Sequence, residues 1–173
     1  MKNYFKPCNI FQNYCEYNYL LSILKKNKII SCCQKIDLNY NGNNFSINTN
    51  ELKRNYFNIY EIKEKSITLN FIKECVKNRQ YLLLLFNTFF CKENQFYKKL
   101  QNYNMILIYG FKKNKIFCYM NLGFQGSKKI SYDYEELIQF LVEFKQYKDL
   151  NFEPMIIERQ NKKVIIQLLF FIK

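Results

Sequence analysis

The segment from Asn104 to Phe124 constrains the fold of this chain more than any other. Two runs of apolar and aromatic residues flank the shorter, more polar stretch Gly110–Lys115. Such a pair of runs around a turn is typical of a β-hairpin, and Gly110 permits a bulge or a positive φ angle there. We therefore predict that this hairpin is the centre of a sheet. Its polar ends, Asn104 and Asn121, are the positions where we expect function to be decided.

Periodicity along the rest of the chain predicts further helices and strands around this hairpin. Apolar residues at helical spacing, each preceded by a capping residue, predict helices over Asn13–Asn27, over Ser66–Asn78 and from Ser131 onward. Strands are predicted on both sides of Asn41-Gly42, over Asn58–Lys63, over the continuous apolar run Tyr81–Phe86, and in a closing hairpin of Met155–Glu158 with Val164–Ile172. The result is an α+β domain.

The length of 173 residues fits a single domain over residues 1–173, since no linker or internal repeat is visible. Asn87–Tyr103 reads as a long polar connection with a helical turn at Gln95–Leu100, and Gly123–Lys128 as a loop. A connection as long as Asn87–Tyr103 in a compact domain more often has a functional role than none. No apolar run is long enough for a transmembrane helix and the first residues lack the apolar core of a signal peptide, so we expect a cytoplasmic protein without a membrane partner.

The charge and cysteine content exclude several classes of protein. The formal net charge is +13, yet only three basic residues are arginine and the chain contains no alanine, which is typical of AT-rich codon usage. Lysines scattered along the chain favour a soluble surface. Sequence-specific recognition of nucleic-acid bases instead prefers arginine, which can form two hydrogen bonds to one base. The seven cysteines are an odd number without a secretion signal, and there is no Cys-x-x-Cys and no histidine. Reduced thiols are therefore expected, with no metal site and no cofactor.

Cys15 stands in the first turn of the predicted helix Asn13–Asn27. Unpaired backbone N–H groups and the positive end of the helix dipole lower the pKa of a thiol at such a position. Two interpretations stay open at this point. Cys15 is either a site residue or a small hydrophobic residue packed under the helix.

A cysteine at the start of an N-terminal helix, followed later by a strand pair with polar ends, resembles the layout of papain-like cysteine enzymes. More specifically, four segments resemble the butirosin-biosynthesis-protein-H N-terminal family, C39-peptidase-like proteins of natural-product gene clusters: Asn13–Cys15, Leu20–Leu24, Leu85–Phe90 and Met105–Phe111. The resemblance covers about Cys15 to Phe144. It implies a papain-like (C39-like) α+β fold, with the N-terminal helix packed on an antiparallel sheet and further helices beside it.

The resemblance also implies a set of site residues. Cys15 matches the nucleophile of the family, Asn104 stands where its catalytic histidine is found, and Asn121 matches the residue that orients this histidine. Asn87 lies near a position at which relatives usually carry aspartate. The amide of the oxyanion hole would come from Asn9 or Gln12. For the asparagines, an ordinary role in turns and strand ends is the alternative, because the chain is rich in asparagine.

The missing histidine separates this chain from an active enzyme. Asparagine accepts no proton at neutral pH, so a thiolate–imidazole pair cannot form. We therefore expect a degenerate, non-catalytic accessory or binding protein of a biosynthetic cluster, with a peptide or an acyl- or peptidyl-carrier protein as its partner. One alternative is a Cys15-dependent acyl or peptidyl transferase acting on a carrier-bound thioester. Another is a lysine-rich binding module for nucleic acid or an acidic carrier.

Overall fold

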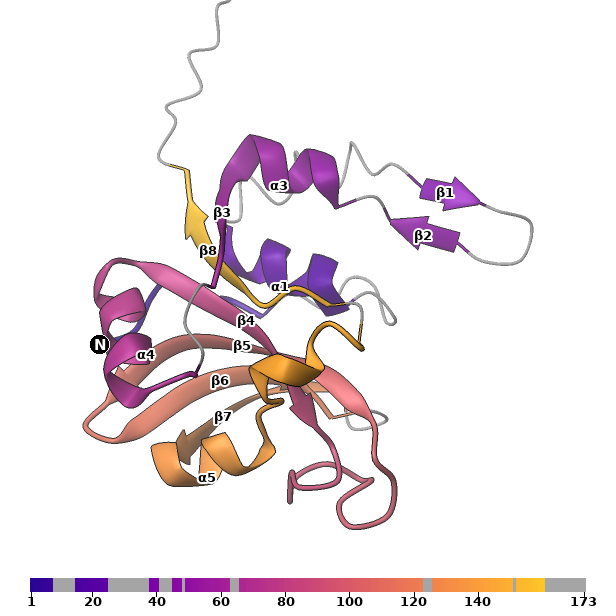
Figure 1. Ribbon diagram of the computed structural model, residues 1–173. Coiled ribbons are helices and arrows are strands. Elements are labelled where there is room, and N and C mark those ends of the chain that lie inside the picture. Colours follow the sequence, from indigo (N-terminus) through magenta and orange to yellow (C-terminus); the bar gives the residue numbers. More distant parts are fainter. Residues whose placement is uncertain are drawn as a thin grey trace, which may run out of the picture.

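A six-stranded antiparallel sheet dominates the computed structural model (Figure 1), which describes residues 1–7, 15–24, 38–40, 45–47, 49–62, 66–122, 126–150 and 152–160. The spatial order is β3-β8-β4-β5-β6-β7. The strands are β3 (Phe57–Glu61), β4 (Gln80–Asn87), β5 (Tyr103–Lys112), β6 (Lys115–Asn121), β7 (Ser127–Asp133) and β8 (Met155–Arg159). The late strand β8 pairs with both β3 and β4, so a segment from the end of the described chain lies between two earlier strands.

Helices cover both faces of the sheet. Side chains of a strand alternate between faces, and in β5 Leu107 packs with the helices α1 (Cys15–Ile23) and α3 (Asn50–Tyr56). Ile106 instead packs with α4 (Leu69–Lys77) and α5 (Tyr134–Phe140). The central strands are therefore buried on both sides, as the continuous apolar run of β4 requires, where every residue from Tyr81 to Asn87 is buried.

The predicted central hairpin is confirmed. Strands β5 and β6 pair in antiparallel fashion with Lys112 opposite Lys115, and Lys113 in the turn has a φ angle of 56°. A bulge lies between Ile108 and Gly110, as the glycine allows. Gly110 also permits close approach of the chain start, because a Cβ atom there would lie 3.0 Å from the carbonyl oxygen of Met1.

Several other predictions hold with shifted boundaries. The hairpin around Asn41-Gly42 is confirmed by the pairing of β1 (Leu38–Tyr40) with β2 (Phe45–Ile47). The helix predicted from Ser66 begins at Leu69, because Thr68 and not Ser66 caps it: its Oγ1 accepts a hydrogen bond of 3.1 Å from Phe71 N.

Two local predictions are wrong. Ser131 does not start a helix, because Ser131–Asp133 pair with β6 as part of β7, and α5 begins only at Tyr134. The same pairing converts the end of the predicted loop Gly123–Lys128 into strand from Ser127. The helical turn predicted at Gln95–Leu100 is confirmed, because Leu100 N donates a hydrogen bond of 3.1 Å to Phe96 O. The predicted second strand of the closing hairpin, Val164–Ile172, lies outside the described residues.

The papain-like (C39-like) fold prediction is also wrong. The protein is a small, sheet-rich α+β fold, and none of the helices in the described ranges is longer than nine residues. The physical reason is strand pairing: β8 satisfies its backbone groups between the distant strands β3 and β4, and β7 extends the central hairpin beyond β6, so the sheet widens to six strands.

Candidate functional site

The start of β5 and the end of β6 form a polar corner where α1 meets the sheet. Tyr19 of α1 is fully buried, and its hydroxyl donates a hydrogen bond of 2.8 Å to Met105 O. The same hydroxyl accepts a hydrogen bond of 3.0 Å from Asn121 N. One phenol thus joins the helix that begins with Cys15 to both strands of the central hairpin. Sequence reasoning did not single out Tyr19, although a tyrosine on the apolar face of a helix needs a partner for its hydroxyl.

Asn104 and Asn121 meet at this corner, but not through their two amides. Asn104 Nδ2 donates a 3.4 Å hydrogen bond to the backbone oxygen of Asn121. Ile106 pairs with Met120, so Met105 lies opposite Asn121 and shares a sheet face with it. By the same alternation Asn104 belongs to the other face, beside its partner Phe86. The side chain of Asn121 is therefore on the α1 face and that of Asn104 on the α4 and α5 face.

The remaining predicted site residues are described to different extents. Cys15 is the first residue of α1, and only its backbone is described. Asn9 and Gln12 lie outside the described residues. Asn87 is 8% exposed, and its Oδ1 accepts a 3.0 Å hydrogen bond from Phe89 N, which starts the turn after β4. This contact gives Asn87 a structural role of the kind that asparagine often has in turns.

An open groove of about 720 Å³ lies next to this corner, with Met105 in its wall. Its lining is apolar at Met105, Phe144, Tyr147, Phe152 and Met155 and charged at Lys53, Glu61, Lys148 and Glu153, with Ile62 and Pro154 completing it. A second groove of about 440 Å³ shares the side chain of Phe144 and runs along α5, where Ile138 is exposed. Sequence reasoning missed both grooves, because they combine residues from distant segments.

Tyr147 in the larger groove is a structural phenol. Its hydroxyl accepts a hydrogen bond of 3.0 Å from Leu85 N and lies 3.5 Å from Leu85 O. Burial raises the pKa of Tyr147 to about 12, so the phenol is neutral at pH 7. It therefore supplies no base to a ligand in the groove.

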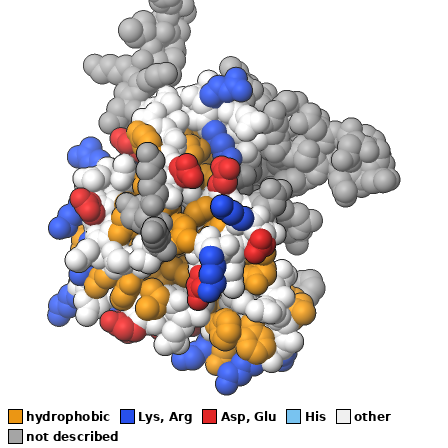
Figure 2. Space-filling model, in the orientation of Figure 1, with side chains coloured by type: hydrophobic (Ala, Val, Ile, Leu, Met, Phe, Trp, Pro, Cys, Tyr) orange, Lys and Arg blue, Asp and Glu red, His pale blue; other side chains and the backbone are white. Residues whose placement is uncertain are grey.

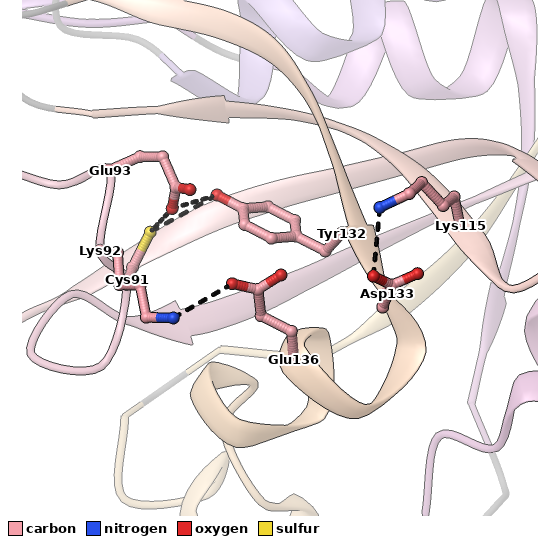
Figure 3. Close-up of polar contacts among 7 residues, drawn as sticks. All are labelled: Cys91, Lys92, Glu93, Lys115, Tyr132, Asp133 and Glu136. Atoms are coloured by element: carbon pink, nitrogen blue, oxygen red, sulfur yellow. Dashed lines mark hydrogen bonds and ion pairs between the residues drawn. The ribbon is translucent and has the colours of Figure 1, made fainter.

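A buried polar cluster of Cys91, Glu93 and Tyr132 lies elsewhere, where the β4–β5 connection meets β7 (Figure 3). Tyr132 donates a hydrogen bond of 2.8 Å to Glu93 Oε2, and Cys91 Sγ lies 3.6 Å from the same oxygen and 3.8 Å from the phenol. Burial raises the pKa of Cys91 to about 11, and it also raises the pKa of Tyr132. A protonated, buried thiol is a poor nucleophile, so the cluster is an anchor for the connection and not a reactive site.

No metal-binding group is found in the described ranges: no three Cys, Asp or Glu side chains there gather in a way that could hold an ion. Among the same residues, no helix has the length and apolar character needed to cross a membrane. Comparison of the chain with protein-family models, with curated proteins and with solved structures finds no match. The resemblance to the butirosin-biosynthesis-protein-H N-terminal family stays a prediction, and functional inference depends on the geometry above.

Proposed function

We propose that this protein is a non-catalytic binding or accessory protein that holds an extended acyl or peptidyl chain in the larger groove. The observation that carries the proposal is an open groove of about 720 Å³ whose lining combines large apolar side chains with four charged ones. Ligand sites in proteins are typically concave, mainly apolar and equipped with a few polar groups that orient the ligand. The two methionines, Met105 and Met155, add adaptable apolar surface suited to chains of varied shape.

Two lysines and two glutamates line the groove, so it offers both cationic and anionic contacts to the polar groups of a bound chain. Lys148 is exposed at the groove and presents an ammonium group to a carboxylate or phosphate of the ligand. In the biosynthetic setting that the sequence resemblance implies, a carrier protein would present such a chain. The resemblance alone supports this setting.

The composition of the groove favours binding over catalysis. No cysteine, serine or threonine is among the residues that line it, and its carboxylates, Glu61 and Glu153, are exposed to solvent. The chain has no histidine to serve as a general base. A ligand in this groove would therefore have no catalytic nucleophile and no general base beside it.

Titration of the protein with a fluorescent fatty acid and with a fluorescent apolar peptide tests the proposal. Phe152→Ala removes an aromatic wall of the groove and is expected to weaken binding about tenfold, or ~1.4 kcal/mol. Ile138→Ala, in the smaller groove, is the matched control and should leave affinity within about twofold. Absence of saturable binding to the wild type, or equal effects of the two variants, would refute the proposal.

A Cys15-dependent transferase is the second candidate, because Tyr19 holds the helix that begins with Cys15 against the polar corner. Iodoacetamide labelling at neutral pH, read by mass spectrometry, separates the two functions. An activated thiolate would make Cys15 react well before the other cysteines. The binding proposal expects Cys15 to react no faster than a free cysteine in solution.

A further inference from the structure

The connection between β4 and β5, residues 88–102 (here the β4–β5 loop), presents an apolar and basic surface. Phe90 and Leu100, at opposite ends of this loop, are each 50% exposed. Lys92, Lys98 and Lys99 are exposed in the same loop. Figure 2 shows hydrophobic side chains flanked by basic ones at the lower right, where Figure 1 places this loop.

The acidic side chain within the loop does not offset these lysines at the surface. Glu93 is the loop's one acidic residue in the sequence, and its carboxylate accepts the hydrogen bond from Tyr132 of β7. Lys92 lies 3.6 Å from Glu136 of α5 in an exposed ion pair, which solvent screens strongly. The outward face of the loop is therefore positive around its apolar residues.

The loop is held in one shape by its own contacts. Thr88 N donates a hydrogen bond of 2.8 Å to Asn102 O and closes the base of the loop. Lys98 N donates to Phe89 O at 3.0 Å and joins the two halves. The buried contact between Glu93 and Tyr132 fixes the loop to the sheet. A surface ordered in this way loses little conformational entropy when a partner binds.

We propose that the β4–β5 loop is a docking surface for an acidic protein partner, with Phe90 and Leu100 at the centre of the contact and the lysines around them. Protein interfaces commonly have such an apolar centre and a charged rim, and a positive rim is complementary to acidic residues. The loop contains no arginine, which nucleic-acid recognition favours. None of the residues that line the larger groove belongs to the loop, so this proposal is independent of chain binding in that groove.

Fluorescence anisotropy with a labelled synthetic peptide, in which Asp and Glu flank a central Leu-Phe pair, tests the docking surface. The charge-reversal variant K98E/K99E is expected to weaken binding at least about tenfold. Its matched control is K112E/K113E in the β5–β6 turn, which changes the net charge equally. It also has the same backbone constraint, because φ is 54° at Lys98 and 56° at Lys113. This control should remain within about twofold of the wild type.

A second pair of variants tests the apolar centre of the surface. Phe90→Ala is expected to weaken peptide binding about tenfold. Tyr60→Ala, on the distant strand β3, removes an aromatic ring that is 44% exposed and should have little effect. Thermal unfolding of all four variants verifies that each one is folded.

Three results would overturn the docking proposal. The first is an absence of saturable peptide binding by the wild type. The second is an equal loss of affinity in K98E/K99E and K112E/K113E, which would indicate a non-specific effect of net charge. The third is that single-stranded RNA or anionic vesicles bind as tightly as the peptide and that Phe90→Ala leaves their affinity unchanged. This result would mean that the lysines attract phosphate groups in general and do not mark a protein-binding surface.

Discussion

The hydroxyl of Tyr19 accepts a hydrogen bond of 3.0 Å from the backbone amide of Asn121, a residue 102 positions away in the chain. The same hydroxyl donates to the carbonyl of Met105, so it satisfies one backbone group on each strand of the central hairpin. Because Tyr19 is fully buried, water cannot replace these contacts. Through these two hydrogen bonds, Tyr19 links the helix that starts at Cys15 to the polar corner of the sheet.

Tyr19→Phe is expected to destabilise the protein by ~1–3 kcal/mol, since it leaves the partly buried amide of Asn121 and carbonyl of Met105 without this partner. Urea unfolding followed by circular dichroism measures the change. Tyr60→Phe is the control, because the Tyr60 hydroxyl makes an exposed contact of 3.3 Å with Glu158. That control should change stability by less than ~0.5 kcal/mol. Equal losses in the two variants would mean that the Tyr19 hydroxyl is not buried as described.

Gly110→Ala is expected to lower the melting temperature through a steric conflict. The added Cβ would lie 3.0 Å from both Met1 O and Lys2 Cγ, so Met1 and Lys2 must shift, at a cost of ~1–3 kcal/mol.

Gly126 provides the contrasting control for this prediction. It has a φ angle of +71° and open space around its Cα. Gly126→Asn should therefore be tolerated, because asparagine adopts the left-handed conformation readily, whereas Gly110→Asn should not be. Similar melting temperatures for the two asparagine variants would contradict this assignment.

Thr68→Ala is expected to cost ~1 kcal/mol, because Thr68 Oγ1 caps α4 by accepting the hydrogen bond from Phe71 N. Ser66→Ala is the matched control, since Ser66 is the cap that the sequence pattern favoured. Chemical unfolding of both variants gives the difference. A larger loss for Ser66→Ala would show that the helix begins where the sequence predicted.

Stability should fall in the alkaline range because of the buried thiol of Cys91. Its pKa is raised from 9.0 to about 11 by burial, so the folded state keeps the proton that the unfolded state releases. The stabilisation is complete below pH 9 and is lost as the pH rises toward about 11, with a slope of up to ~1.4 kcal/mol per pH unit.

Cys91→Ser, which lacks a titrating thiol, tests the origin of this slope. Unfolding free energies measured from neutral pH to pH 10.5 should decrease less steeply for the variant than for the wild type. The buried tyrosines contribute in the same direction, since burial raises the pKa of Tyr81 and Tyr147 to about 12. Parallel pH profiles for the two proteins would exclude Cys91 as a contributor.

The described cysteines should differ from an exposed thiol in their reactivity. Cys91 and Cys118 are fully buried, and burial raises the pKa of both thiols. We expect neither to react with iodoacetamide in the native protein and both to react in concentrated urea, as measured by peptide mass spectrometry. Rapid native labelling of Cys91 would mean that the β4–β5 loop opens readily.

Local patterns in the sequence determined the elements whose residues interact with near neighbours. The continuous apolar run Tyr81–Phe86 predicted β4. The apolar runs on either side of the turn at Lys113 predicted β5 and β6, because a two-residue turn pairs strands that are adjacent in the chain. The apolar face of the helix after Thr68 likewise predicted α4 to within a few residues. Gly110 was predicted to allow a bulge or a positive φ angle, and the structure shows the bulge.

Only the tertiary structure decided which distant segments pair and which face each site residue occupies. The insertion of β8 between β3 and β4, and the recruitment of Ser131 into β7, depend on backbone partners more than twelve residues away, which periodicity does not reveal. The sequence resemblance gave Asn104 and Asn121 as site positions, but strand register decides the face of each side chain, and a difference of one residue reverses it. The sequence therefore determined the central hairpin. The strand register decided which face each polar side chain occupies, and the packing of α1 decided that Tyr19 hydrogen-bonds to the ends of both strands.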